Sequence, residues 1–352
     1  MKSLMENALN SNSQETKKDI EMLAPRIMVI GTGGAGCNTV NRISNMGVAG
    51  AQLVAVNTDK QHLSIINDEL TKILIGKSVT RGLGAGGYPE IGAKAAEVSK
   101  SALEEVLRDV DMLFVSAGMG GGTGTGSAPI IAKIAKEHGA IVISIVTYPF
   151  ALEKSRLLKA EEGLQNLTSF SDTVIVIDNN RLVELVPNLP IQDAFKVADE
   201  VTARTVRGIT ETITQPSLIN LDFADVKSIM SNQKLSVISV GESSSNNKVE
   251  EVVEESLKNS LMDADISGAT GALIHITGGP ELTLGEANRV GELLTESIDP
   301  KASVIWGARI DPTFSNKIEV ISIFTGLNSK EVKGINLSEQ TKNKKNLGLG
   351  LI

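Results

Sequence analysis

The stretch DMLFVSAGMGGGTGTGSAPIIAKIAKEHG, residues 111–139, decides the fold of this chain. It begins with an apolar run, 111–117, of the kind found in strands that are buried on both faces of a sheet. A loop with glycine at six of nine positions, 118–126, follows, and then a helical pattern, 128–139. Glycines between a strand and a helix let backbone N–H groups approach phosphate oxygens, and threonine hydroxyls can add further donors. A flexible linker is the alternative, but a linker joins independent units rather than a strand and its helix.

A second loop of this kind lies upstream. The strand pattern RIMVI, 26–30, leads into GTGGAG, 31–36, and then into the helical pattern CNTVNRIS, 37–44. Asp59 follows about twenty residues later, at the end of the next strand, which is the spacing of a dinucleotide-binding Rossmann site. The motif alone is weak evidence, because a purely structural turn can carry the same glycines.

A third glycine loop, TRGLGAGGYPEIG at 80–92, again follows a strand pattern, KILI at 72–75, and leads into a helix. Three such loops on one sheet edge suit a triphosphate better than a dinucleotide, and a Rossmann NAD site has no second loop at its fourth strand. A P-loop is excluded, because the GKS at 76–78 resembles the end of a Walker A motif but position 71 is threonine where glycine is required.

The order of the remaining patterns indicates the architecture. Apolar runs at 52–56, 140–149 and 173–178 alternate with helical patterns such as the one at 90–109. Strands that alternate with helices of this length predict an α/β fold with a doubly wound parallel sheet. A long amphipathic helix, 191–213, then stops just before Gln215 and Pro216, since proline disfavours helical geometry in the residue before it.

The pattern changes after this helix. Four strand patterns, separated by two helical ones, predict a second, smaller α+β domain; the strands are at 234–241, 270–278, 302–310 and 317–326, and the helices at 248–261 and 283–297. We therefore expect five parts: a flexible N-terminal arm at 1–25, a nucleotide-binding domain at 26–190, a central helix at 191–214, a C-terminal α+β domain at 215–328 and a flexible tail at 329–352.

Composition limits the class of protein. The 352 residues are 41% hydrophobic and 22% charged, with a mean hydropathy of +0.05, as expected of a soluble globular protein. The net charge of −8 argues against a general nucleic-acid binder. One cysteine and three histidines exclude a disulfide framework and the common structural zinc sites. No long apolar run and no signal-peptide core are present, which predicts a cytoplasmic location without insertion into a membrane.

Five motifs taken together resemble FtsZ, the family of tubulin-like GTPases of prokaryotic cell division. They are GTGGAG at 31–36, VNTD at 56–59, TRGLGAGG at 80–87, GGGTGTG at 120–126 and NLDFADV at 220–226. The resemblance covers roughly residues 26–328. The segments TGALIHITG at 270–278 and IWGARID at 305–311 are similar to those of archaeal members. It implies a tubulin-like fold and a filament that assembles with GTP and hydrolyses it between successive subunits.

The resemblance also implies where GTP or GDP lies. The phosphate-binding and adjoining residues would be Gly34, Ala35, Gly36, Cys37, Asn38, Asn57, Asp59, Ala85, Gly86, Gly87, Gly120, Gly121, Gly122, Thr123, Gly124 and Thr125. Cys37, taken by itself, is typical of a small packing residue. Mg²⁺ would be held mainly by phosphates and water, because no protein cage is evident and no metal ligand is assigned.

Guanine recognition is implied for Phe195 and Asp199, which stand at i and i+4 and therefore share one helix face. In the family the matching aromatic ring stacks on the base, and the matching carboxylate accepts from N1–H and the N2 amino group, donors that adenine lacks in that arrangement. Asn179 can meet the base edge through its amide. The alternative is that Phe195 belongs to the core and Asp199 to a solvated face.

The ribose is assigned to Glu153, in the context PFALE at 149–153. The family often has an arginine four residues after this glutamate. Here position 157 is leucine and Arg156 is the nearest arginine, so the role of Arg156 stays open.

Asp222 and Asp225 match the family loop that enters the nucleotide site of the next subunit. Two carboxylates at i and i+3 share a face and could polarise an attacking water or help to hold a cation. The alternative is structural, since Asp222 is a good helix N-cap and Asp225 favours a first helical turn.

The implied partners are copies of the chain itself, in a head-to-tail protofilament at the mid-cell division ring. Membrane-anchoring division proteins would bind the tail, which ends in NLGLGLI at 346–352. No nucleic-acid partner is expected. Two other functions remain open: a tubulin-like scaffold that does not hydrolyse GTP, and an NAD(P)-dependent oxidoreductase that uses only the glycine loop at 31–36.

Overall fold

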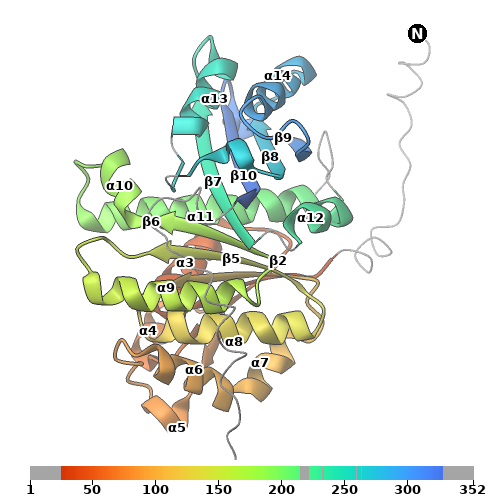
Figure 1. Ribbon diagram of the computed structural model, residues 1–352. Coiled ribbons are helices and arrows are strands. Elements are labelled where there is room, and N and C mark those ends of the chain that lie inside the picture. Colours follow the sequence, from red (N-terminus) through yellow and green to blue (C-terminus); the bar gives the residue numbers. More distant parts are fainter. Residues whose placement is uncertain (1–24, 215–221, 232–233, 259, 263, 328–352) are drawn as a thin grey trace, which may run out of the picture.

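The computed structural model describes residues 25–214, 222–231, 234–258, 260–262 and 264–327. Most of the predicted arm, the predicted tail and the start of the NLDFADV motif therefore lie outside the described residues. Within the described part the strands form one sheet of ten, in the order β3-β2-β1-β4-β5-β6-β7-β10-β8-β9 (Figure 1).

The first six strands are parallel, which confirms the doubly wound sheet that the alternating pattern predicts. They are β1 (Ile27–Thr32), β2 (Ala51–Asn57), β3 (Thr71–Leu74), β4 (Met112–Gly118), β5 (Ile141–Tyr148) and β6 (Thr173–Asp178). Every residue of β1 is buried, because helices cover both faces of this sheet.

Helices pack on the two faces of the sheet as two separate cores. On one face lie α6 (Pro89–Val98), α7 (Lys100–Leu107), α8 (Thr123–Glu137) and α9 (Lys154–Thr168). On the other lie α3 (Gly33–Met46), α4 (Lys60–Ile65), α10 (Asn179–Leu185), α11 (Ile191–Thr214) and α12 (Phe223–Met230). The short α5 (Lys77–Thr80) packs against α6.

The C-terminal part continues the same sheet. Its strands are β7 (Lys234–Ser243), β8 (Gly271–Gly278), β9 (Ser303–Ile310) and β10 (Ile318–Leu327), and its helices are α13 (Lys248–Lys258) and α14 (Leu284–Thr295). Two short 3₁₀ turns, Ile266–Gly268 and Pro312–Phe314, complete it. In Figure 1 α13 and α14 lie at the top with these strands, and α11 crosses the middle of the molecule.

The joint between the two parts is a short strand pairing that the sequence did not reveal. β6 pairs in parallel with β7 over three residues, Thr173 to Lys234 through Ile175 to Ser236. The two domains therefore share one sheet at this seam, whereas the change of pattern after 213 suggested only a second α+β unit.

Helix boundaries near the glycine loops differ from the prediction. The helices expected from 37 and from 128 begin at Gly33 and at Thr123, so the glycines themselves form the first turns. The single helix expected at 90–109 is broken at Ser99, whose hydroxyl accepts a hydrogen bond of 2.9 Å from the backbone N–H of Gly76. This contact with a distant residue is not readable from helical periodicity.

Candidate functional site

A cleft of about 580 Å³ opens at the carboxyl ends of the parallel strands. It lies between the ends of β1 and β4, where Thr32 and Gly118 line it and where the strand order reverses. Ligands of open α/β sheets bind at such a switch point. We call this hollow the nucleotide cleft.

The glycine loop at 31–36 packs backbone to backbone against strand β4 and against the glycine loop at 118–126. A Cβ placed on Gly36 would lie 2.1 Å from the carbonyl oxygen of Ser116, and one on Gly33, where φ is +73°, would lie 2.7 Å from the backbone nitrogen of Gly124. No side chain fits at either position. These glycines therefore bring the starts of α3 and α8 together at one end of the cleft.

Both helices point free N-termini into the cleft. Neither N-cap residue, Thr32 for α3 or Gly122 for α8, provides a side-chain hydrogen bond to its helix. The first backbone N–H groups of a helix lack intrahelical partners, and the helix dipole adds a partial positive charge there. Two such ends side by side form a binding site for anionic groups such as phosphates.

The two threonine hydroxyls of the loop at 118–126 differ in their contacts. The Oγ1 of Thr123 lies 2.6 Å from that of Thr58, just after β2, so it joins this loop to the end of β2. Thr125 is buried behind the lining, and its Oγ1 has no partner among the described residues. Backbone N–H groups are therefore the main donors at this end of the cleft, and of these two threonines only Thr123 belongs to the lining.

The opposite end of the cleft carries the residues expected at the base. Phe195 is 42% exposed, and its ring meets that of Phe150 edge to face with centres 5.7 Å apart. It is thus not a core residue. Asp199 accepts a 2.7 Å hydrogen bond from the hydroxyl of Thr39, and burial raises the pKa of its carboxyl above the ordinary value. The Oδ1 atom of buried Asn179 has no partner among the described residues and can accept from a ligand.

Glu153 and Arg156 form an ion pair on the rim of the cleft, with 2.6 Å between Oε2 and Nη1. Arg156 is three residues after the glutamate, one helical turn along the start of α9. The backbone of Arg156 also packs against the glycine loop at 118–126, since a Cβ on Gly120 would lie 2.8 Å from the carbonyl oxygen of Arg156.

Most of the residues expected at the nucleotide line the cleft. They are Gly34, Ala35, Asn38, Asn57, Asp59, Ala85, Gly86, Gly87, Gly121, Gly122, Thr123, Gly124, Glu153, Arg156, Asn179, Phe195 and Asp199. Gly36, Cys37, Gly120 and Thr125 lie behind this lining. Burial raises the pKa of the Cys37 thiol to about 12, so it remains protonated and packs as a small side chain.

Nine further residues line the cleft without having been assigned a role of their own. Thr32, Gly33, Gly84, Gly118 and Met119 belong to the three glycine loops, and Pro149 begins the PFALE segment. Sequence reasoning missed His62, Thr147 and Ala198 altogether. His62 lies 3.4 Å from the amide nitrogen of Asn57, and its backbone N–H is capped by Asp59. Its position three residues after the VNTD motif is the signal that could have identified it.

Asp222 and Asp225 lie away from the cleft of their own chain. Asp222 is the N-cap of α12 and accepts a 2.8 Å hydrogen bond from the backbone N–H of Asp225. Both residues are exposed. In Figure 1 α12 lies at the opposite end of α11 from α10, which borders the cleft. The capping role of Asp222 is therefore real, and Asp225 is exposed in the first turn of α12.

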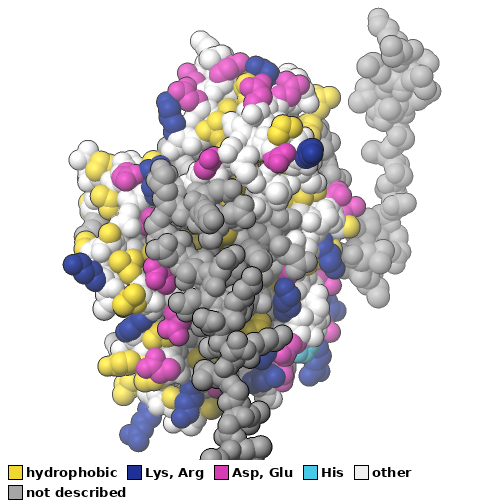
Figure 2. Space-filling view, in the orientation of Figure 1, with side chains coloured by type: hydrophobic (Ala, Val, Ile, Leu, Met, Phe, Trp, Pro, Cys, Tyr) yellow, Lys and Arg dark blue, Asp and Glu magenta, His cyan; other side chains and the backbone are white. Residues whose placement is uncertain are grey.

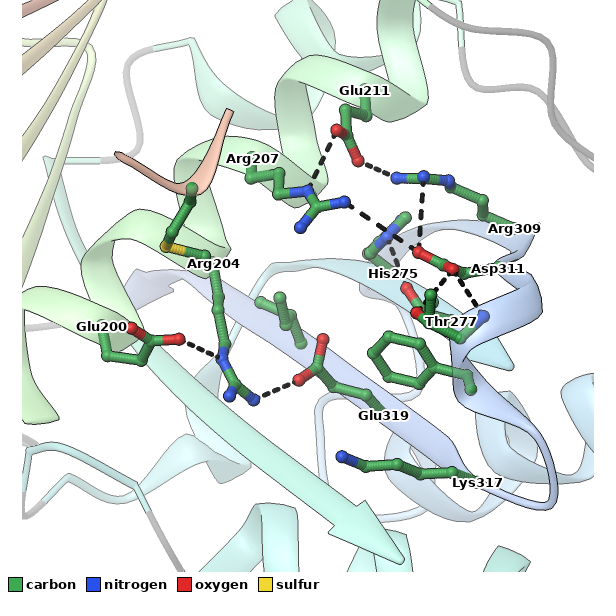
Figure 3. Close-up of a pocket in the computed structure, with 15 residues that line it drawn as sticks. Glu200, Arg204, Arg207, Glu211, His275, Thr277, Arg309, Asp311, Lys317 and Glu319 are labelled. Carbon is green, nitrogen blue, oxygen red and sulfur yellow. Dashed lines mark hydrogen bonds and ion pairs between the residues drawn. The ribbon is translucent and has the colours of Figure 1, made fainter. Parts of the chain in front are cut away.

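A second hollow, of about 320 Å³, lies between α11 and strands β8, β9 and β10 (Figure 3). Its charged lining consists of Arg204, Arg207, Arg309 and Lys317 facing Glu200, Glu211, Asp311 and Glu319. We call it the ion-pair cavity. Sequence reasoning did not identify it, because its members come from segments that are far apart along the chain.

The charges of this cavity are paired with one another. Glu211, which is 4% exposed, pairs with Arg309 and accepts a 3.0 Å hydrogen bond from Nε of Arg207. Arg204 pairs with Glu319 at 2.5 Å, yet burial raises the pKa of the Glu319 carboxyl. Burial and the neighbouring Arg207 lower the pKa of His275 to about 4, so this imidazole is neutral at pH 7.

Three further features concern the surface, metal sites and membrane-spanning helices. On the face shown in Figure 2, acidic and basic side chains are interspersed over the described part. Among the described residues no group of three or more His, Cys, Asp or Glu side chains could hold a metal ion. No helix in the described ranges is long and apolar enough to cross a bilayer.

Comparison with known proteins assigns this architecture. The model of the Tubulin/FtsZ family, GTPase domain, matches residues 26–187, and that of the FtsZ family, C-terminal domain, matches 235–328. A protein named cell division protein FtsZ 2 from Methanocaldococcus jannaschii is 56% identical over 334 residues, which are 94% of this chain and 88% of that protein. The chain belongs to the FtsZ family. It is therefore a GTPase of prokaryotic cell division, as its motifs suggested, and the NAD(P)-dependent oxidoreductase is excluded.

Further members support this FtsZ assignment. The FtsZ 2 of Haloferax volcanii is 54% identical over 316 residues, 90% of this chain and 79% of that protein. A solved structure described as an empty FtsZ dimer from M. jannaschii superposes with a TM-score of 0.84 at 45% identity, covering 92% of this chain and 99% of that one. The tubulin-like fold is thus confirmed.

Proposed function

We propose that GTP lies in the nucleotide cleft with its triphosphate on the N-termini of α3 and α8 and on the loop at 84–87. Guanine lies at the other end, between the ring of Phe195 and the acceptors of Asp199 and Asn179, and Glu153 meets the ribose. The convergence of two uncapped helix N-termini on one glycine-lined end carries this placement. The acceptors at the base end match the N1–H and N2 amino donors of guanine, so ATP binds more weakly than GTP.

Hydrolysis is completed by a second subunit. Asp222 and Asp225 of one chain enter the cleft of the next chain in a head-to-tail filament, where a carboxylate accepts a hydrogen bond from the attacking water. Water attacks the γ-phosphorus, the bond to the β–γ bridging oxygen breaks, and GDP and inorganic phosphate leave. The exposure of both residues, away from their own cleft, supports this shared site.

Mg²⁺ enters with the triphosphate. Since the described residues offer no cage for a resident ion, the cation is held by phosphate oxygens and water, and we assign it no protein ligand.

The filament forms at the mid-cell division ring, and the predicted tail at 329–352 binds membrane-anchoring division proteins. In this proposal the GTP-binding domain spans 26–190, the central helix 191–214 and the C-terminal domain 215–328.

Light scattering and phosphate release, followed in parallel with GTP, GDP and ATP, test this function. Assembly and phosphate release with GTP alone, both rising steeply above one threshold of protein concentration, are expected. Assembly with GTP without phosphate release would instead favour the scaffold that does not hydrolyse. Phosphate release at concentrations where monomer dominates would contradict a site shared between subunits.

A mixing experiment separates the two faces of the subunit. Gly122→Ser damages the cleft, since a Cβ there would lie 2.8 Å from the Cβ of Ala85, and Asp225→Ala damages the opposite face. Each variant alone is expected to be nearly inactive. The mixture contains interfaces in which an intact cleft meets an intact Asp225, so it recovers part of the phosphate release.

A further inference from the structure

Lys159, in the second turn of α9, lies beside the third glycine loop. Its Nζ donates a 2.6 Å hydrogen bond to the carbonyl oxygen of Gly87 and lies 5.4 Å from the centre of the Tyr88 ring. One ammonium thus engages two consecutive residues of the loop, through a charge-assisted hydrogen bond and a cation–π contact. We propose that Lys159 is a positioning residue for GTP, which holds the backbone of this loop against the phosphates. The inference rests on the proposed placement of GTP.

The loop needs an external anchor because of its own composition. Gly84, Gly86 and Gly87 all have positive φ, at +85°, +60° and +77°. Glycine loses more conformational freedom on ordering than any other residue, so such a loop is costly to hold in one shape. At its near end the N–H of Gly84 donates to the carbonyl of Thr58 at 3.2 Å. At its far end the N–H of Tyr88 donates to the carbonyl of Ala85 within the loop at 3.1 Å, and Lys159 donates to the carbonyl of Gly87 from outside the loop.

The loop between these two anchors faces the ligand. Ala85, Gly86 and Gly87 line the cleft, and their N–H groups donate to no acceptor among the described residues. Consecutive free N–H groups in a glycine loop are the donors that phosphate oxygens use. An anchor on the Gly87 carbonyl fixes the direction of the peptide planes that carry these donors.

The same loop also supports the start of α8. A Cβ on Gly122 would lie 2.8 Å from the Cβ of Ala85 and 2.9 Å from the backbone nitrogen of Tyr88. The third loop is thus in close contact with the N-cap of the helix that receives the phosphates. Displacement of the loop therefore disturbs two parts of the phosphate site together.

Lys133 provides a matched comparison. It also places an ammonium over an aromatic ring, 5.7 Å from the centre of Phe170, and pairs weakly with Glu137 at 3.9 Å. It belongs to α8 but does not line the cleft, and no hydrogen bond joins it to a loop carbonyl in the described part of the chain. Loss of the lysine–ring contact alone can therefore be measured at Lys133.

The test measures dissociation constants for GTP and for guanosine, which has no phosphate, in Lys159→Met, Lys159→Arg and Lys133→Met. Lys159→Met is expected to raise the GTP value about tenfold and to leave the guanosine value within about twofold, because the lost contact serves the phosphate end. Arginine can donate to the same carbonyl and stack on the same ring, so Lys159→Arg recovers most of the affinity. Lys133→Met leaves both values unchanged.

Unchanged GTP affinity in Lys159→Met would overturn the inference. Equal losses for GTP and guanosine would also overturn it, since they would assign Lys159 to general stability. Hydrogen exchange without nucleotide separates this inference from the placement of GTP. Lys159→Met should speed exchange of the Gly84 and Tyr88 amides, which are hydrogen-bonded to the carbonyls of Thr58 and Ala85, and Lys133→Met should not. If the unmutated chain failed to bind GTP, the proposed function would be wrong, whereas equal exchange in all variants would exclude the anchor itself.

Discussion

The nucleotide cleft and the ion-pair cavity share helix α11 but satisfy their polar groups in opposite ways. The cleft is lined mainly by glycines and small residues, and its donors are backbone N–H groups that await a ligand. The cavity is lined by four basic and four acidic side chains; all but Lys317 pair with one another, and Lys317 pairs with Glu242 outside the lining. A dense cluster of charges is therefore not by itself evidence of a ligand site, because its members can satisfy one another, whereas backbone N–H groups without acceptors can bind an anion.

The largest effect is expected from Asp225→Ala, which leaves both hollows of its own chain intact. Turnover per assembled subunit should fall about a thousandfold, because the group that polarises the attacking water is lost, while GTP binding to the monomer stays normal. Glu250→Ala, which removes an exposed acidic residue from the first turn of α13, is the control. If Asp225 only supports its helix, the loss is about 0.5–1 kcal/mol of stability and turnover barely changes.

The second prediction tests whether the ion-pair cavity contributes to stability without contributing to GTP binding. Glu211→Gln removes a buried negative charge shared by Arg207 and Arg309, and it should lower the free energy of unfolding by about 3 kcal/mol. GTP affinity should stay within about twofold, as the cleft does not depend on this charge. Denaturant unfolding and nucleotide titration measure the two effects. A large loss of GTP affinity without a loss of stability would show that the cavity belongs to the nucleotide site.

The third prediction concerns the cleft alone. Asp199→Ala removes the acceptor for two guanine donors and should reduce GTP affinity by about 2–3 kcal/mol, with little change in the affinity for a triphosphate that lacks a base. Competition titrations with the two ligands measure this. Equal losses for both would mean that Asp199 acts through its contact with Thr39 on α3 rather than through the base.

The smallest expected effect is a pH dependence of stability that arises from His275 in the ion-pair cavity. The pKa of His275 is about 4 in the folded chain, below its ordinary value of 6.5, so the unfolded chain binds more protons between these values. Stability should therefore fall as pH is lowered from 7 to 5, by about 1.5 kcal/mol from this group. In His275→Gln that part of the pH dependence should disappear. An unchanged slope would show that the carboxylates of the cavity, and not His275, titrate in this range.

Much of the fold and the cleft could be predicted from the sequence because the signals are local. Each glycine loop follows its strand closely, and the carboxyl ends of parallel strands meet at one edge, so the order of the patterns places the three loops together. The individual residues of the cleft were assigned from the resemblance to a known family. Helical spacing placed Phe195 and Asp199 on one face, but by itself it left a core residue and a solvated carboxylate as the alternative. The resemblance to a known family supplied their roles.

The remaining features depend on contacts between distant segments. The break at Ser99 needs Gly76, the seam between β6 and β7 needs two strands on either side of α11, and Arg309 meets Glu211 only once α11 has packed on the C-terminal strands. No periodicity along the chain records such pairings. The ion-pair cavity was missed for the same reason.

The seam between β6 and β7 has a consequence for synthesis on the ribosome. When β6 has emerged, its partner on the outer side is still to come, because β7 begins only at Lys234, after the whole of α11. Until then a nearly fully buried, apolar strand presents an open edge to other chains. A chain truncated after α11 would lack β7, so the edge of β6 would stay open. Such truncated chains should aggregate rather than persist as an independent GTP-binding domain.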